Sequence, residues 1–106
     1  MLLFGPMKLT EIKYKNKIIK VSFKNIEEYG YFETNDNTLV IRKGLTKRIL
    51  GRTLFHELFH IIVTLNDFPV ANHGEEKVAG LTEEYYSILK QNKVLRNLIN
   101  RCILVE

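Results

Sequence analysis

Two histidines and a glutamate stand at a spacing that suits a metal site. The segment His56-Glu57-Leu58-Phe59-His60 matches the H-E-x-x-H pattern of zinc-binding helices. Residues four apart lie on one face of a helix, about 6 Å apart along its axis, so both imidazoles can reach one zinc ion at about 2.0 to 2.1 Å. The spacing therefore predicts that His56 and His60 form a two-histidine zinc clamp.

Glu57 follows the first histidine and is rotated from it by about 100° around the helix. Its carboxylate can then reach the open coordination position of the metal rather than the metal itself. Zinc can lower the pKa of a bound water toward about 7, and Glu57 would take the proton of that water and pass it to a leaving amine. We predict that Glu57 is the catalytic base of peptide or amide hydrolysis.

A catalytic zinc of this kind needs a third protein ligand, for which His73, Glu75 and Glu76 are candidates. Measured from Glu75, the apolar face of the following helix lies at about 310°, which puts Glu75 about 50° and Glu76 about 150° from the core direction. Helical phase therefore favours Glu75. Glu76 is the alternative if the helix starts with a distorted turn, and His73 can serve as a ligand or as a hydrogen-bond donor at the cleft mouth.

The element that must carry the H-E-x-x-H segment is a long amphipathic helix. From Leu45 onward, apolar residues recur every three or four positions, which predicts a helix of about 20 residues with Thr46 as its N-cap and Pro69 beyond its end. The core-facing stripe includes Leu54, Leu58, Ile61 and Ile62. The histidines lie on the neighbouring face, toward a cleft.

The first half of the chain predicts two hairpins. Lysines alternate with apolar residues over 12–23 around a break at Asn16-Lys17, which favours paired antiparallel strands. Strand-like segments 29–34 and 38–42 flank Asn-Asp-Asn, and such residues tolerate the left-handed backbone of tight turns.

The second half predicts two further helices. One spans about 75–91, with Asn92 as its break, and a short amphipathic tail helix covers about 94–105. The predicted fold is one α+β domain over residues 1–106: a small, mostly antiparallel sheet packed on the H-E-x-x-H helix, a second helix with the third ligand, and a short C-terminal helix. Residues 1–6 are interpreted as a loose extension.

Composition narrows the possible partners and compartments. Residues 1–53 hold eleven basic and five acidic side chains, but the lysines alternate with apolar residues like the solvent face of strands, which argues against nucleic-acid binding. No apolar run is long enough to span a membrane, and the N-terminus does not resemble a signal peptide. A single cysteine, Cys102, cannot form an internal disulfide, which favours a cytoplasmic protein with a buried thiol.

The tyrosines are weaker candidates. Tyr85 and Tyr86 follow Glu75 on the second helix, where a phenol could stabilise the oxyanion of a tetrahedral intermediate, and Tyr31 is a third possibility. Packing in the core is the commoner role of a tyrosine.

These motifs resemble the zincin metallopeptidases, more narrowly the small gluzincin-like proteins of phage and prophage regions related to the ImmA/IrrE peptidases. The resemblance rests on TLFHELFHI at 53–61 and on EEKVAGLTEEYYSIL at 75–89, and extends over about residues 29–95. It implies that His56, His60 and Glu75 bind Zn²⁺, that Glu57 is the base, and that a peptide or protein is the substrate. It also implies that the strand ending near Ile41 is the edge on which an extended peptide pairs.

The sequence departs from that family at two points. Many gluzincins carry an acidic residue four positions after the glutamate ligand, where this chain has Ala79, or Gly80 if Glu76 is the ligand. The appended recognition domain of larger relatives is also missing. A metzincin assignment fails because Asn66 and Val63 stand where its third histidine and its glycine are expected.

Two other functions are compatible with the sequence. The protein could be a non-catalytic zincin-fold module that holds a protein or a nucleic acid, or an interaction protein without metal. The presence of Glu57 beside the open metal position favours the enzyme, because a pure binder has no use for a carboxylate there. The sequence leaves the cleavage specificity and the oligomeric state open.

Overall fold

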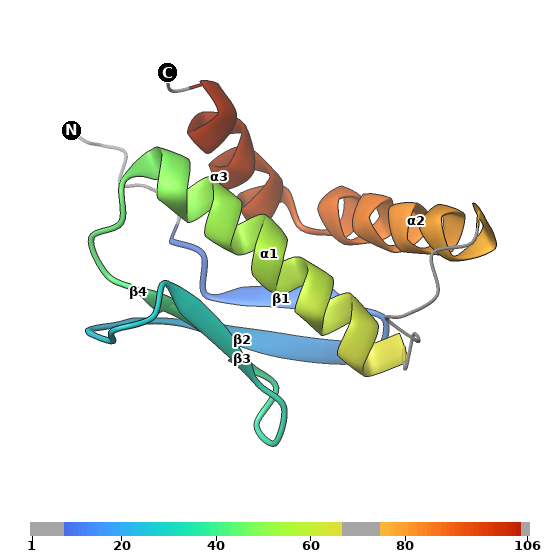
Figure 1. The fold of residues 1–106 in the computed structure, drawn as a ribbon, viewed down its shortest axis with the longest axis horizontal. Helices are drawn as coiled ribbons and strands as arrows, with labels where there is room; N and C mark the ends of the chain where they lie inside the picture. Colours follow the sequence, from blue (N-terminus) through green and yellow to red (C-terminus); the bar gives the residue numbers. More distant parts are fainter. Residues whose placement is uncertain (1–7, 67–74, 105–106) are drawn as a thin grey trace.

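The computed structural model describes residues 8–66 and 75–104, apart from the side chains of 75–79, 82 and 103–104 (Figure 1). The described elements are β1 (Glu11–Tyr14), β2 (Lys17–Lys24), β3 (Gly30–Glu33), β4 (Thr38–Arg42), α1 (Lys47–Asn66), α2 (Glu75–Gln91) and α3 (Lys93–Leu104). The predicted α+β class and the order of the elements are confirmed.

The four strands form one mixed sheet in the order β1-β2-β4-β3. Both predicted hairpins are present as antiparallel pairs, β1 with β2 and β3 with β4. The hairpins join through parallel pairing of β2 with β4, in which Val21 lies opposite Leu39. Because the chain passes from β2 to the far edge before it returns as β4, β3 becomes an edge strand and β4 lies inside the sheet.

The turns follow the conformational preferences of their residues with one shift. Asn37 adopts the left-handed backbone that its residue type tolerates, with φ 48°. The first hairpin turns at Lys15 and Asn16, one residue earlier than the predicted break, with Lys15 at φ 56°. Lys17 is already in the ladder, because it pairs with Tyr14.

The core lies between one face of the sheet and α1. Alternate strand residues point toward the helix, and each is at most 8% exposed: Ile12, Tyr14, Ile19, Val21, Leu39 and Ile41. The predicted helix stripe meets them and is fully buried: Leu54, Leu58, Ile61 and Ile62. Each such side chain contributes roughly 1.5 to 3 kcal/mol by burial, so the stripe fixes the rotation of α1 about its axis.

The N-terminal end of α1 is held by a cap and by close contact with α3. Thr46 is the N-cap, since its hydroxyl accepts a hydrogen bond from the Ile49 N–H at 3.3 Å. Farther along, a Cβ added at Gly51 would lie 2.7 Å from Cys102 Cβ, so only glycine lets the helices approach this closely. Cys102 is buried as predicted, and burial raises the pKa of its thiol.

Asn92 breaks the helix as predicted and also joins α2 and α3 to the sheet. Its side-chain oxygen accepts from the Lys13 N–H at 2.7 Å, and its amide nitrogen donates to the Lys13 carbonyl at 2.8 Å. The same amide donates to the Ile88 carbonyl, and Arg96 donates to the Leu89 and Lys90 carbonyls. The carbonyls of Ile88, Leu89 and Lys90 in the last turn of α2 thereby have side-chain partners.

The helices also bear on the prediction that no segment spans a membrane. α1 has 20 residues, but its exposed side carries charged side chains and histidines. Within 8–66 and 75–104, none of the helices has both the length and the apolar character needed to cross a bilayer.

Candidate metal centre

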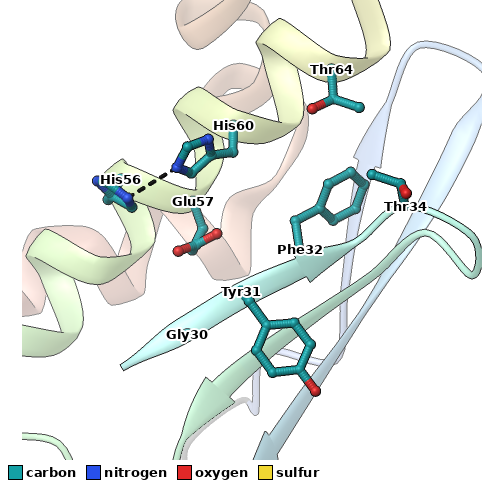
Figure 2. A pocket seen from close by; sticks show the side chains of 8 residues that line it. All are labelled: Gly30, Tyr31, Phe32, Thr34, His56, Glu57, His60 and Thr64. Carbon is teal, nitrogen blue, oxygen red and sulfur yellow. Dashed lines mark hydrogen bonds between the residues drawn. The ribbon is translucent and has the colours of Figure 1, made fainter. Parts of the chain in front are cut away.

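The side chains of His56 and His60 converge beside one hollow. Their Nε2 atoms lie 3.0 Å apart and both residues are exposed. Figure 2 shows the two rings turned toward each other on the same side of α1. Two ligands bound at about 2.0 to 2.1 Å to a tetrahedral zinc lie roughly 3.3 Å from each other. The pair therefore fits the first two ligand positions of such an ion, and without a metal one imidazole can donate to the other.

The position of the histidines follows from the packing of α1. Leu58 stands between the two histidines in the sequence, and Ile61 directly follows the second. Both side chains are fully buried, and their burial fixes the helix against the sheet. Residues at a spacing of four then form a line along the exposed side of the helix: Arg52, His56, His60 and Thr64. This line runs beside β3.

Glu57 lies below the histidines and extends from α1 toward β3 (Figure 2). It is only 5% exposed, although a carboxylate prefers water. Burial raises the pKa of the Glu57 carboxyl above its ordinary value, while the neighbouring His60 and His56 act in the opposite direction. A carboxylate held this way is a better proton acceptor than an exposed one.

The hollow in front of these residues has a volume of about 350 Å³. Its walls come from α1 on one side and from β3 on the other: His56, Glu57, His60 and Thr64 face Gly30, Tyr31, Phe32 and Thr34. The Phe32 ring points into the gap between the two elements, whereas the Tyr31 ring points to the opposite side of the strand (Figure 2).

The strand beside the hollow is β3, which corrects the expectation that the strand ending near Ile41 would be the edge. β4 is enclosed between β2 and β3. The Arg42 N–H donates to the Tyr29 carbonyl, so these two residues form a hydrogen-bonded pair of the antiparallel ladder. In such a ladder the next pair exchanges no hydrogen bonds, and the two kinds of pair continue to alternate along the strands. The backbone polar groups of Gly30 and Phe32 therefore point away from β4, at the free edge.

Gly30 allows β3 to approach α1 closely. A Cβ at this position would lie 3.0 Å from the Val40 carbonyl oxygen and 3.1 Å from both Ile41 Cδ1 and Thr53 Cγ2. Such contacts are tighter than normal, so a side chain here would push the strand away from the helix. The width of the hollow depends on this glycine.

The candidates for the third ligand lie outside the described residues. α2 begins at Glu75, but the side chains of Glu75 and Glu76 are not described, and His73 falls in the undescribed segment 67–74. Among the side chains that are described, no three of His, Cys, Asp or Glu come together as a metal site. The choice among Glu75, Glu76 and His73 stays a prediction.

Two of the three tyrosine candidates lie away from the hollow. Tyr85 donates its hydroxyl to the Phe55 carbonyl at 2.9 Å, which ties α2 to α1, and burial raises its pKa to about 12. Tyr86 is 63% exposed, so it does not pack in the core, which was the alternative to a catalytic role. Neither tyrosine lines the hollow, and the Tyr31 hydroxyl points away from Glu57.

Sequence reasoning missed several residues of the hollow. Thr64 stands four residues after His60, so the same spacing argument that paired the histidines could have found it. Gly30, Phe32 and Thr34 carry no local signal of this kind, because their position depends on which strand is at the edge.

Comparison of the chain with protein-family models, with curated proteins and with solved structures finds no match.

Proposed function

We propose that the protein is a zinc-dependent peptidase whose active site is the hollow between α1 and β3. The observation that carries the proposal is the convergence of two imidazole nitrogens, 3.0 Å apart, above a glutamate that is 5% exposed. His56 and His60 would hold the ion with a third ligand, for which Glu75 is preferred and Glu76 is the alternative. When bound, zinc supplies a Lewis acid that polarises the scissile carbonyl and acidifies water.

Glu57 would act as the base in this reaction. It accepts a proton from the water that adds to the carbonyl carbon of the substrate, and it returns that proton to the amine nitrogen as the carbon–nitrogen bond breaks. The position of Glu57 beside the two histidines, on the wall of the hollow, supports this role. The glutamate ends the cycle in its starting state.

The free edge of β3 would bind the substrate. The outward backbone groups of Gly30 and Phe32 can pair with an extended peptide, which would then run beside His56 and His60. This arrangement suits a peptide or an unfolded segment of a protein. The buried, single thiol of Cys102 suits a reducing cytoplasm.

A second candidate function uses the same surface without catalysis. The free edge of β3 would hold a peptide whether or not a bond is broken, so the protein could be a binding module. Glu57 separates the two functions, because a module that only binds peptide does not need a buried carboxylate.

The test is metal content and hydrolysis measured together. The purified chain is reconstituted with zinc, dialysed and analysed for metal, beside His56→Ala, Glu75→Ala, Glu76→Ala and His73→Ala. Each protein is then incubated with a quenched-fluorescent peptide mixture. We expect about one zinc per chain and peptide cleavage in the unmodified protein.

Loss of zinc in His56→Ala and in one of the three downstream variants identifies the third ligand. If the unmodified protein holds no zinc after reconstitution, the proposal is wrong. Bound zinc without cleavage of any peptide would leave only the binding module.

A further inference from the structure

A second hollow lies beside the first, on the side of His56 that faces the start of α1. It has a volume of about 290 Å³ and is lined by Tyr29, Arg52, Thr53 and His56. His56 lines both hollows, so the two adjoin at the candidate metal centre. The mechanism above uses neither Arg52 nor Tyr29.

Arg52 is placed to contact a peptide bound on β3. It precedes His56 by four residues, so it lies on the same side of α1, about 6 Å along the axis. One residue of an extended peptide advances about 3.3 Å. The guanidinium, on its long side chain, is therefore within reach of a substrate residue one or two positions from the bond that is broken.

Arg52 is not ion-paired within the described part of the chain. In the sequence Glu27 and Glu28 precede Tyr29 and Glu57 follows His56, so acidic as well as cationic residues stand near this hollow. Acidic residues usually occupy the first turn of a helix, but α1 has none there. In the described part of the chain the one ion pair, Lys15 with Glu84, lies at another place.

Arg52 also has suitable chemistry. A guanidinium presents a planar fork that matches both oxygens of a carboxylate, and the neighbouring Tyr29, 53% exposed, adds a phenol at the same hollow. A cation that is not already ion-paired attracts a carboxylate more strongly than one that is.

We propose that Arg52 is a specificity-determining residue that selects peptides with an aspartate or glutamate one or two positions from the scissile bond, on the side of the hollow next to Tyr29. This inference rests on the proposed function for the identity of the groove. The residue contacts the substrate side chain and takes no part in proton transfer.

The experiment uses binding and hydrolysis as separate measurements. Fluorescein-labelled peptides, each with Asp, Asn or Lys fixed at one position, are titrated against zinc-reconstituted Glu57→Gln protein, and binding is followed by fluorescence anisotropy. Unlabelled peptides of the same design are given to the unmodified protein, and cleavage is followed by mass spectrometry. Fixing one position at a time separates a local preference from an effect of total peptide charge.

Arg52→Glu is compared with Arg101→Glu, an exposed residue on α3 that produces the same change in net charge. We expect Asp to be preferred over Asn by about tenfold at one position, and Arg52→Glu to reverse the preference toward Lys. Arg101→Glu keeps the preference for Asp. Circular dichroism and zinc content show that each variant is folded and loaded.

The outcomes separate the two proposals. Cleavage without a preference for Asp, or a preference that survives in Arg52→Glu, overturns the role of Arg52 and leaves the peptidase standing. Binding that prefers Asp through Arg52 without any cleavage supports the role of Arg52 and overturns the peptidase. If no peptide binds and none is cleaved, both proposals are wrong.

Discussion

The two edges of the sheet meet helices in different ways. At the β1 edge, polar side chains from α1, from α2 and from the helix junction bind the strand. At the β3 edge, α1 lies across a hollow, and the outward backbone groups of Gly30 and Phe32 face that hollow. We call these the closed edge and the open edge.

The closed edge is bound at several points. Asn92 binds the N–H and the carbonyl of Lys13, and Tyr14 donates its hydroxyl to Glu84 and accepts from Asn66. Lys15 contacts Glu84 and Asn66 as well. These contacts satisfy polar groups and prevent another chain from pairing with β1.

At the open edge, no described residue bonds the outward backbone groups of Gly30 and Phe32. The helix face beside them carries two exposed histidines and an exposed arginine, and the buried polar residues on this side of the described chain are Glu57 and Thr53. Such an arrangement contributes little to stability, since the burial of a carboxylate opposes folding. The difference indicates that the closed edge serves folding and that the open edge serves binding, and four paired substitutions test this.

The largest effect is expected for Glu57→Gln at the open edge. Hydrolysis falls by about a thousandfold because the base is lost, while zinc stays bound. The metal-free protein becomes no less stable in urea, since the amide avoids the cost of a buried charge. Glu83→Gln, an exposed change on α2, leaves both measurements unchanged. A large loss of stability in Glu57→Gln would show that the carboxylate is structural.

Asn92→Ala tests the closed edge. It removes three side-chain hydrogen bonds and leaves the polar groups of Lys13 with no partner, so the free energy of unfolding falls by about 3 kcal/mol. At the open edge, Thr34→Ala changes it by less than about 0.5 kcal/mol, since Thr34 is exposed. Urea unfolding checks both values, and equal losses would contradict the distinction between the edges.

Gly30→Ala tests the width of the hollow. The added methyl meets three neighbours at 3.0 to 3.1 Å, so we expect a loss of about 2 kcal/mol in stability and weaker peptide binding. Thr53→Ser removes one of those neighbours, Thr53 Cγ2. The double variant should recover part of the loss, and additive losses in a double-mutant cycle would show that the two residues are not in contact.

Tyr14→Phe is expected to have the smallest effect at neutral pH, about 1 kcal/mol. Burial, with Glu84 beside it, raises the pKa of Tyr14 from 10.0 to about 12. The protonated phenol therefore contributes stability that is complete below pH 10 and is lost as the pH rises toward 12. The variant should lose less stability than the unmodified protein over that range.

Denaturant unfolding at several alkaline pH values measures this difference. Tyr86→Phe is the matched control, because Tyr86 is 63% exposed. If Tyr14→Phe loses as much stability at alkaline pH as the unmodified chain, another titrating group causes the loss. Tyr85, whose pKa is also raised to about 12, is then the next candidate.

Local patterns in the sequence predicted most elements. The stripe of Leu54, Leu58 and Ile61 predicted α1, and the same helical geometry predicted that His56 and His60 share a face. Thr46 was predicted as the cap from its residue type, and Asn92 as the break between helices. These predictions succeeded because each depends on contacts within one or two turns of the chain.

The sequence by itself determined the elements and the pair of histidines, since residue spacing along a helix is a local property. Only the tertiary structure decided that β3 is the edge strand, that Gly30 and Arg52 border adjoining hollows beside His56, and that Asn92 binds β1. Parallel pairing of β2 with β4 and the contact between Asn92 and Lys13 join residues far apart in the chain. Such contacts depend on how the hairpins and helices pack together, and no spacing rule within one segment contains that information.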